Sequence, residues 1–197
     1  MSVAGSEEGD MRAVVVYESM YGNTHLVADA IGDGLREAEN LDEVVVVPVG
    51  DADEALATAV DLLVVGGPTH VHGMSRETTR EEAVRQAGEP DSGLTLDPDA
   101  EGTGLREWFD SLHRLDVPAA AFDTRVDLPV ALTGRASKGI ARRLRKLHCH
   151  ELSDPRSFLV TTETELEPEE ATHAREWGAE FAAMLASSSA RGAATAR

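Results

Sequence analysis

RAVVVYESMYGNTHLVADAIGDG, residues 12–34, is the stretch from which the rest of the chain can be placed. It opens on a continuous apolar run, 13–17, which is typical of a strand buried on both faces. It closes on apolar side chains spaced as one face of an amphipathic helix: Leu26, Val27, Ala30, Ile31 and Leu35. Two glycines near the end, Gly32 and Gly34, predict either a ragged last turn or close packing of this helix on the sheet.

The turn between strand and helix, residues 18–24, is rich in hydroxyl groups. The first N–H groups of a helix have no intrahelical partner and carry the positive end of its dipole, so they attract anions. Ser19, Tyr21 and Thr24 add O–H donors, Asn23 adds an amide, and Gly22 lets the backbone come close. No lysine or arginine lies in the turn. The pattern predicts a phosphate site made of neutral donors; the alternative is an ordinary turn capped by Ser19 or Thr24.

The segment VVVYESMYGNT, residues 14–24, resembles the phosphate-binding signature of flavodoxins and flavodoxin-like proteins. In that signature, hydroxyl-x-hydroxyl-G-x-T follows the first strand, as it does here. The resemblance implies FMN as the cofactor. Its phosphate would lie on Ser19, Met20, Tyr21, Gly22, Asn23 and Thr24.

The remaining apolar patterns alternate between strand and helix. Strands are predicted at 13–17, 44–47, 62–65, 117–122 and 158–162, with helices at 24–35, 51–60, 76–87, 105–115, 137–148 and 168–185. This alternation predicts an α/β fold, a three-layer, doubly wound, five-stranded parallel sheet. The resemblance implies the flavodoxin-like strand order 2-1-3-4-5.

The length and the even spread of apolar segments predict one domain with polar ends. We expect a disordered leader at 1–10, a flavodoxin-like domain over 11–186, and a disordered tail at 187–197. Residues 88–104 are rich in Gly, Pro and Asp, which predicts a long surface loop: either a lid or a family-specific insertion.

Ligands of an open doubly wound sheet bind at the carboxyl ends of strands where the strand order reverses. For this order, the loops after the first, third and fourth strands meet there. The resemblance implies that the last two loops flank the flavin ring. The residues so implied are Pro68, Thr69, His70, Val71, His72 and Gly73 on one side, and Thr124 and Arg125 on the other.

The chain departs from the family in its aromatic residues, which make up only 4% of it. Flavodoxins commonly stack aromatic side chains on the flavin from these two loops. Here the third-strand loop offers His70 and His72, and the fourth offers no aromatic side chain. Stacking would therefore fall to imidazole or to the Arg125 guanidinium, and would be weaker.

Acidic side chains outnumber basic ones by 36 to 18, giving a net charge of −18. Nucleic acids and anionic membranes select cationic surfaces, so we expect neither as a partner. The charge favours a redox partner protein with a basic docking face; solubility alone is the other explanation. No apolar run reaches the length of a membrane span, and the single cysteine, Cys149, permits no intrachain disulfide. We therefore expect a cytoplasmic protein.

One segment, residues 135–146, carries six basic side chains and no acidic one. A solvated helix face would explain it. The alternative is a landing site for an acidic partner or for the phosphates of a reduced nicotinamide. Pairs of histidines at 70–72 and around Cys149 could supply metal ligands, but neither spacing forms a recognised site, so no metal is expected.

Three functions stay open. The first is an FMN-binding electron carrier, in which no residue is assigned a catalytic role. The second is an NAD(P)H-dependent quinone reductase on the same fold, whose aromatic-poor face would admit a second substrate over the flavin. The third is a cofactor-free binding or regulatory module that keeps only the fold.

Overall fold

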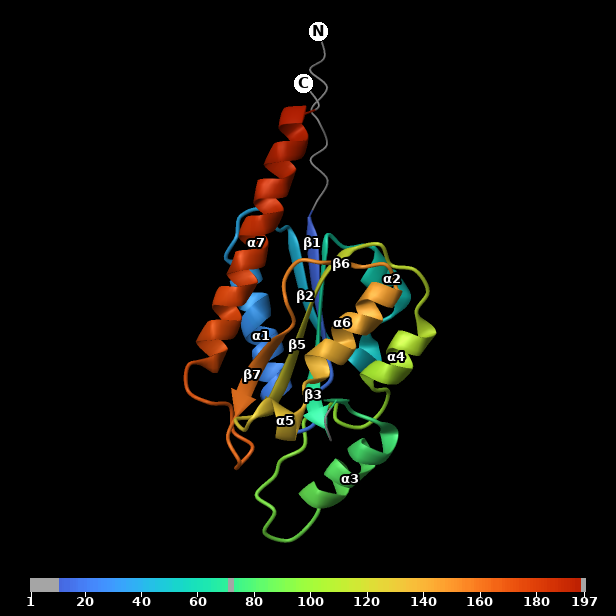
Figure 1. Cartoon of the computed structure of the whole chain (residues 1–197), viewed down its shortest axis with the longest axis vertical. Helices are drawn as coiled ribbons and strands as arrows, with labels where there is room; N and C mark the ends of the chain where they lie inside the picture. The colour runs from blue at the N-terminus through green and yellow to red at the C-terminus, as the bar shows by residue number, and fades with distance from the viewer. Residues whose placement is uncertain (1–10, 71–72, 196–197) are drawn as a thin grey trace.

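The computed structural model describes residues 11–70 and 73–195 (Figure 1). The predicted leader, 1–10, lies outside the described residues. The strands are β1 (Arg12–Tyr17), β2 (Glu43–Pro48), β3 (Leu62–His70), β4 (Gly73–Met74), β5 (Pro118–Val126), β6 (His150–Glu151) and β7 (Arg156–Val160). The helices are α1 (Asn23–Arg36), η1 (Val49–Asp51), α2 (Glu54–Thr58), α3 (Glu77–Ala87), α4 (Leu105–Ser111), α5 (Val130–Thr133), α6 (Ala136–Lys146) and α7 (Glu170–Thr195).

The sheet has the predicted order at its five main positions. Its path runs β2-β1-β3-β5, and all these pairings are parallel. The fifth position, predicted as one strand, is shared by two short strands that both pair with β5: β6 beside Pro118 and Ala119, and β7 beside Phe122 to Val126. The intervening sequence, LSDP, ends in a proline that cannot donate to a ladder, which explains the interruption. In addition, β4 folds back antiparallel on the end of β3.

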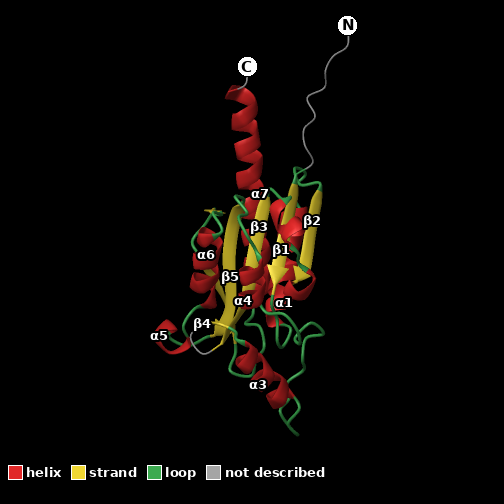
Figure 2. Ribbon diagram, turned by 90° about the vertical axis from the view of Figure 1, so that its right-hand side faces the viewer, coloured by secondary structure: helices red, strands yellow, loops and turns green. Residues whose placement is uncertain are grey.

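Helices cover both faces of the sheet (Figures 1 and 2). Along β1, Ala13, Val15 and Tyr17 belong to the core beneath α1 and α7. The alternate residues, Val14 and Val16, belong to the core beneath α4 and α6. This alternation is why β1 is apolar at every position, as a strand between two helical layers must be. Figure 2 shows α3 beyond the carboxyl ends of the strands.

The first and last helices touch backbone to backbone. A Cβ built on Gly34 would lie 1.9 Å from the carbonyl oxygen of Arg175, and one on Gly178 would lie 2.2 Å from that of Ile31. Gly32 packs on the sheet, because its Cβ would meet Val46 at 2.5 Å. Of the two predicted explanations, close packing is therefore correct, with α7 as the neighbour of Gly34.

The C-terminal segment departs from the prediction. Residues 187–195, expected to be disordered, are the last part of α7, and 196–197 lie outside the described residues. Alanine has the highest helix propensity, and the segment is rich in it. The hydroxyls of Ser187 and Ser188 donate to the carbonyls of Ala183 and Met184, at 2.9 and 3.0 Å. No helix in the described part of the chain is long and apolar enough to cross a membrane.

The α1–α7 contact can be tested with Gly34→Ala. The added methyl group would overlap the Arg175 carbonyl, so the free energy of unfolding should fall by about 2 kcal/mol or more. Gly50→Ala is the matched control, because no atom lies within 4 Å of its added Cβ. Urea denaturation measures both variants. Equal stability of the two would contradict the contact.

Candidate functional site at the carboxyl edge of the sheet

The turn from β1 into α1 has the conformation that an anion site needs. Gly22 is the N-cap of α1 and has φ 88°, a left-handed conformation that glycine adopts without strain. Its N–H donates to Ser19 Oγ at 3.1 Å, and its carbonyl accepts from Leu26 N–H at 2.9 Å. Since α1 begins at Asn23, the N–H groups of its first residues have no intrahelical acceptor. They are available to a ligand.

Two hydrogen bonds join this turn to the end of β5 and to the loop after β7. Thr24 Oγ1 and Thr124 Oγ1 are 2.7 Å apart and buried, which links the start of α1 to the end of β5. Asn23 Nδ2 donates to the Thr164 carbonyl at 2.7 Å, which links the turn to the loop after β7. The turn after β1, the last part of β5 and the loop after β7 therefore meet at the start of α1. Of the residues predicted for the loops after the third and fourth strands, 68–70 and 124–125 lie in β3 and β5 themselves, because both strands extend further than predicted.

Tyr21 differs from its predicted role as an O–H donor to phosphate. Its hydroxyl donates to the Ala83 carbonyl in α3, at 3.0 Å. Burial, followed by the charge of Glu82, raises the pKa of this phenol. The Tyr21 hydroxyl therefore donates to α3 and not to a ligand, while the Tyr21 side chain lines the groove described next.

A groove of about 140 Å³ lies between these loops. The predicted residues that line it are Met20, Tyr21, Asn23, Thr24, Pro68, Thr69, His70, Thr124 and Arg125. Val126, Val160 and Thr164 line it too and were not predicted. Ser19 and Gly22 shape the turn behind it, and Gly73 lines neighbouring cavities instead. Val71 and His72 lie outside the described residues.

Unpartnered polar atoms in the groove wall suit a polar ligand. Among the described residues, His70 Nε2 and Arg125 Nε are buried and have no hydrogen-bond partner. Another nitrogen of the Arg125 guanidinium donates to the carbonyls of Val126 and Leu128, at 3.2 and 2.9 Å, which holds the group in place. The Arg125 guanidinium and the N–H groups of α1 are hydrogen-bond donors, which suits a phosphate-bearing flavin. Because ligand sites are usually about 300–1,000 Å³, FMN would fill the groove and extend beyond it.

The long loop 88–104 packs against the turn and lines no part of the groove. Asp97 N–H donates to the Met20 carbonyl at 2.8 Å, and Asp97 Oδ2 lies 3.1 Å from His25 Nδ1. The His25 ring in turn stacks on Tyr17, with 4.5 Å between ring centroids. Asp97 is 5% exposed, so a buried carboxyl group lies beside a predicted phosphate site. No sequence pattern pointed to this residue.

A second buried carboxylate, Asp123, holds β3 and α6 together on the other side of the groove. It is fully buried and accepts hydrogen bonds from Thr69 Oγ1 at 3.0 Å and from Ser137 N–H at 2.8 Å. Thr69 Oγ1 itself accepts from Ala136 N–H at 2.9 Å. Asp123 thus ties the end of β3 to the N-terminus of α6, whose dipole favours the negative charge. Its place directly before Thr124 was the one available signal in the sequence.

Metal ligands do not gather in the described part of the chain. Within residues 11–70 and 73–195, no group of three or more His, Cys, Asp or Glu side chains is placed to hold a metal ion. The thiol of Cys149 is buried, and this burial raises its pKa.

The environment of His70 predicts a pH dependence of stability. Burial, and then the charge of Arg80, lower the pKa of His70 in the folded chain. The unfolded chain then binds more protons, so this residue reduces stability as the pH falls below about 6.5. In His70→Asn, the free energy of unfolding should therefore fall less between pH 7 and pH 5.5 than in the unsubstituted chain. Urea titrations at pH values across this range measure the free energy of unfolding of both proteins. An equal decrease in the two would contradict a lowered pKa of His70 in the folded chain.

Comparisons with known proteins agree with this fold. A family model described as Flavodoxin matches residues 15–102. No curated protein is similar enough in sequence to count as a match. A solved flavodoxin from the domain Archaea is 20% identical with a TM-score of 0.59, covering 89% of this chain and 99% of that one.

Two further structures are similar in fold. Oxidised Flavodoxin 1 from Bacillus cereus is 22% identical with a TM-score of 0.57, covering 86% of this chain and 96% of its own. Rubredoxin oxygen:oxidoreductase from Desulfovibrio gigas is 15% identical with a TM-score of 0.57, and the match covers 89% of this chain but 36% of that one. The chain is therefore flavodoxin-like: it has the flavodoxin fold, and its residues 15–102 match the flavodoxin family model.

Proposed function

We propose that the chain binds FMN non-covalently and serves as an electron carrier. The proposal rests on the geometry at the start of α1. The turn at Gly22 leaves the first helical N–H groups without intrahelical acceptors, and these groups lie beside the Thr24–Thr124 hydroxyl pair. When bound, FMN supplies one- and two-electron transfer. The protein supplies the binding groups, the orientation of the ring and the electrostatic environment.

The phosphate would be held by neutral groups next to buried acids. Donors are the N–H groups of Asn23, Thr24 and His25 and the hydroxyls of Ser19 and Thr24. Asp97 lies beside the turn, and Glu18, 5% exposed, caps α4 by accepting from Leu105 N–H at 2.8 Å. These carboxylates would repel further negative charge, so the site disfavours a ligand that gains charge on reduction.

The ring would find little aromatic surface. Among the described residues that line the groove, Tyr21 and His70 have aromatic rings, and Arg125 has a planar guanidinium group. Stacking on one phenol and an imidazole contributes less than stacking between two large aromatic side chains. We therefore expect weaker retention of FMN than a site with two stacked aromatics would give.

A quinone reductase that uses NAD(P)H is the second candidate. It is favoured by a groove poor in aromatic cover and by the basic side chains of α6, which could bind the phosphates of a nicotinamide. Rapid bleaching of the bound flavin by NADPH alone would identify this activity. A cofactor-free module is the third candidate, and flavin absorption in the purified protein would exclude it.

The partner in electron transfer would present basic groups. The loop after β7 supplies Thr164 to the groove, and its neighbours Glu163, Glu165 and Glu169 are exposed. This acidic edge adjoins the groove, so a basic face docked on it would come close to the flavin.

The phosphate assignment is tested with Thr24→Val, which keeps the shape and removes the hydroxyl. The dissociation constant of FMN should rise about tenfold or more, because a hydrogen bond to a charged group is worth about 1.5–3 kcal/mol. Riboflavin, which has no phosphate, should bind both proteins alike. Calorimetry measures each pair.

The control is Thr58→Val on exposed α2, where the hydroxyl contacts only carbonyls of its own helix. It should bind FMN as the unsubstituted chain does. Equal affinity of the unsubstituted chain for FMN and riboflavin would show that the turn does not bind phosphate.

A further inference from the structure

A second cavity, of about 420 Å³, lies between α6, α4 and the short strand β4. We call it the basic groove and define it by its six cationic side chains. These are Arg106 of α4, Arg135 at the N-cap of α6, and Lys138, Arg142, Arg143 and Lys146 of α6. The predicted basic segment therefore forms one wall of a hollow, and Arg106 joins it from another helix.

These cations are poorly neutralised. Within the described residues, Arg143 is the one member of the six with an ion pair, to Asp110. Arg106 donates to the carbonyls of Ser75 and Met74, at 2.7 and 3.0 Å, and Arg135 donates to Ser157 Oγ at 3.0 Å. In a chain with 36 acidic and 18 basic side chains, carboxylates are plentiful, yet few reach this groove.

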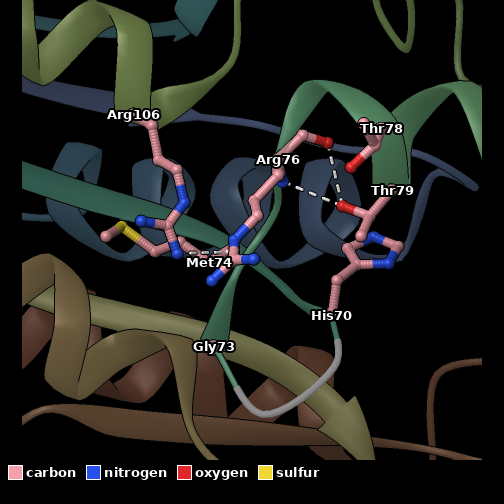
Figure 3. A pocket seen from close by; sticks show the side chains of 7 residues that line it. All are labelled: His70, Gly73, Met74, Arg76, Thr78, Thr79 and Arg106. Carbon is pink, nitrogen blue, oxygen red and sulfur yellow. Dashed lines mark hydrogen bonds between the residues drawn. The ribbon is translucent and has the colours of Figure 1, made fainter.

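Like charges also converge on Arg106. Burial, and then the charges of Arg76 and Arg143, lower the pKa of its guanidinium. Figure 3 shows the side chains of Arg76 and Arg106 pointing toward the same space over Met74. An anion in this space would relieve the repulsion and would meet guanidinium groups, which suit the oxygens of phosphate.

Shared lining residues relate the basic groove to the candidate flavin site. A neighbouring cavity of about 300 Å³ shares Gly73, Met74 and Arg106 with it and also includes Arg76 and His70 (Figure 3). His70 in turn lines the groove at the start of α1. The three cavities are thus neighbours, each sharing at least one lining residue with the next.

We propose that the basic groove binds a small molecule that carries two or more phosphate groups, of the size of a nucleoside diphosphate. Its volume lies within the range of about 300–1,000 Å³ that is usual for small-molecule sites. Because the cations line a concave cavity, they can contact a small anion from several sides, whereas the surface of a protein partner would not enter the cavity. The proposal does not depend on FMN binding, because no residue of the phosphate turn lines this groove.

The test is calorimetry of the full chain with ADP and with pyrophosphate at low ionic strength. We expect saturable binding of both ligands, which Arg142→Ala weakens about tenfold. Arg145→Ala is the matched control: it is the same residue type on the same helix and is also exposed, but it pairs with Glu151 and lies outside the groove. It should change the affinity by less than about twofold.

Three results would overturn the proposal. The first is the absence of saturable binding. The second is equal weakening by both variants, which would show only general charge attraction. The third is tight binding of an acidic peptide without binding of ADP, which would make the face a protein-docking surface.

Two further measurements fix the source of the ligand and separate this site from the flavin site. If NADPH binds the FMN-loaded protein more tightly than ADP does, the phosphates belong to a nicotinamide; comparable affinity would indicate a free phosphorylated ligand. Thr24→Val should bind ADP as the unsubstituted chain does, even where it loses FMN. Loss of ADP binding in that variant would place ADP at the phosphate turn and refute the basic groove.

Discussion

The candidate site depends on how the backbone turns from β1 into α1. One residue in a left-handed conformation, Gly22, directs the start of the helix toward the carboxyl edge of the sheet. The hydroxyl pair of Thr24 and Thr124 then holds this turn against the end of β5. A side chain at position 22 would strain the backbone, and the first N–H groups of α1 would lose their common direction. Any ligand of the groove relies on this local geometry.

Much of this could be predicted because it is local in sequence. The run 13–17, the turn 18–24 and the helical spacing that follows are set by neighbouring residues, and they occur as predicted. That the carboxyl ends of β3 and β5 lie beside this turn follows from the order of the sheet, although both strands continue further than predicted. What could not be predicted depends on distant contacts: Asp97 meets Met20 across a long loop, and the Tyr21 hydroxyl finds Ala83 in α3. Hydrogen bonds of this kind leave no periodic pattern.

Two features of the structure were only weakly indicated by the sequence: the interruption of the fifth strand position and the length of α7. The sequence LSDP contains turn residues, but continuous pairing beside β5 was the simpler expectation. The low apolar content of the C-terminal segment suggested disorder, whereas its alanines favour helix. In both places, backbone preference outweighed the apolar pattern.

The direction of α7 has a practical consequence. It runs from the edge of the sheet that carries the groove to the opposite edge, and its last turns extend past the strands (Figure 1). A protein tethered to a surface through the end of this helix would present its groove to the solution. Its backbone contact with α1 would keep that orientation fixed, so such a tether would suit measurements of ligand binding from solution.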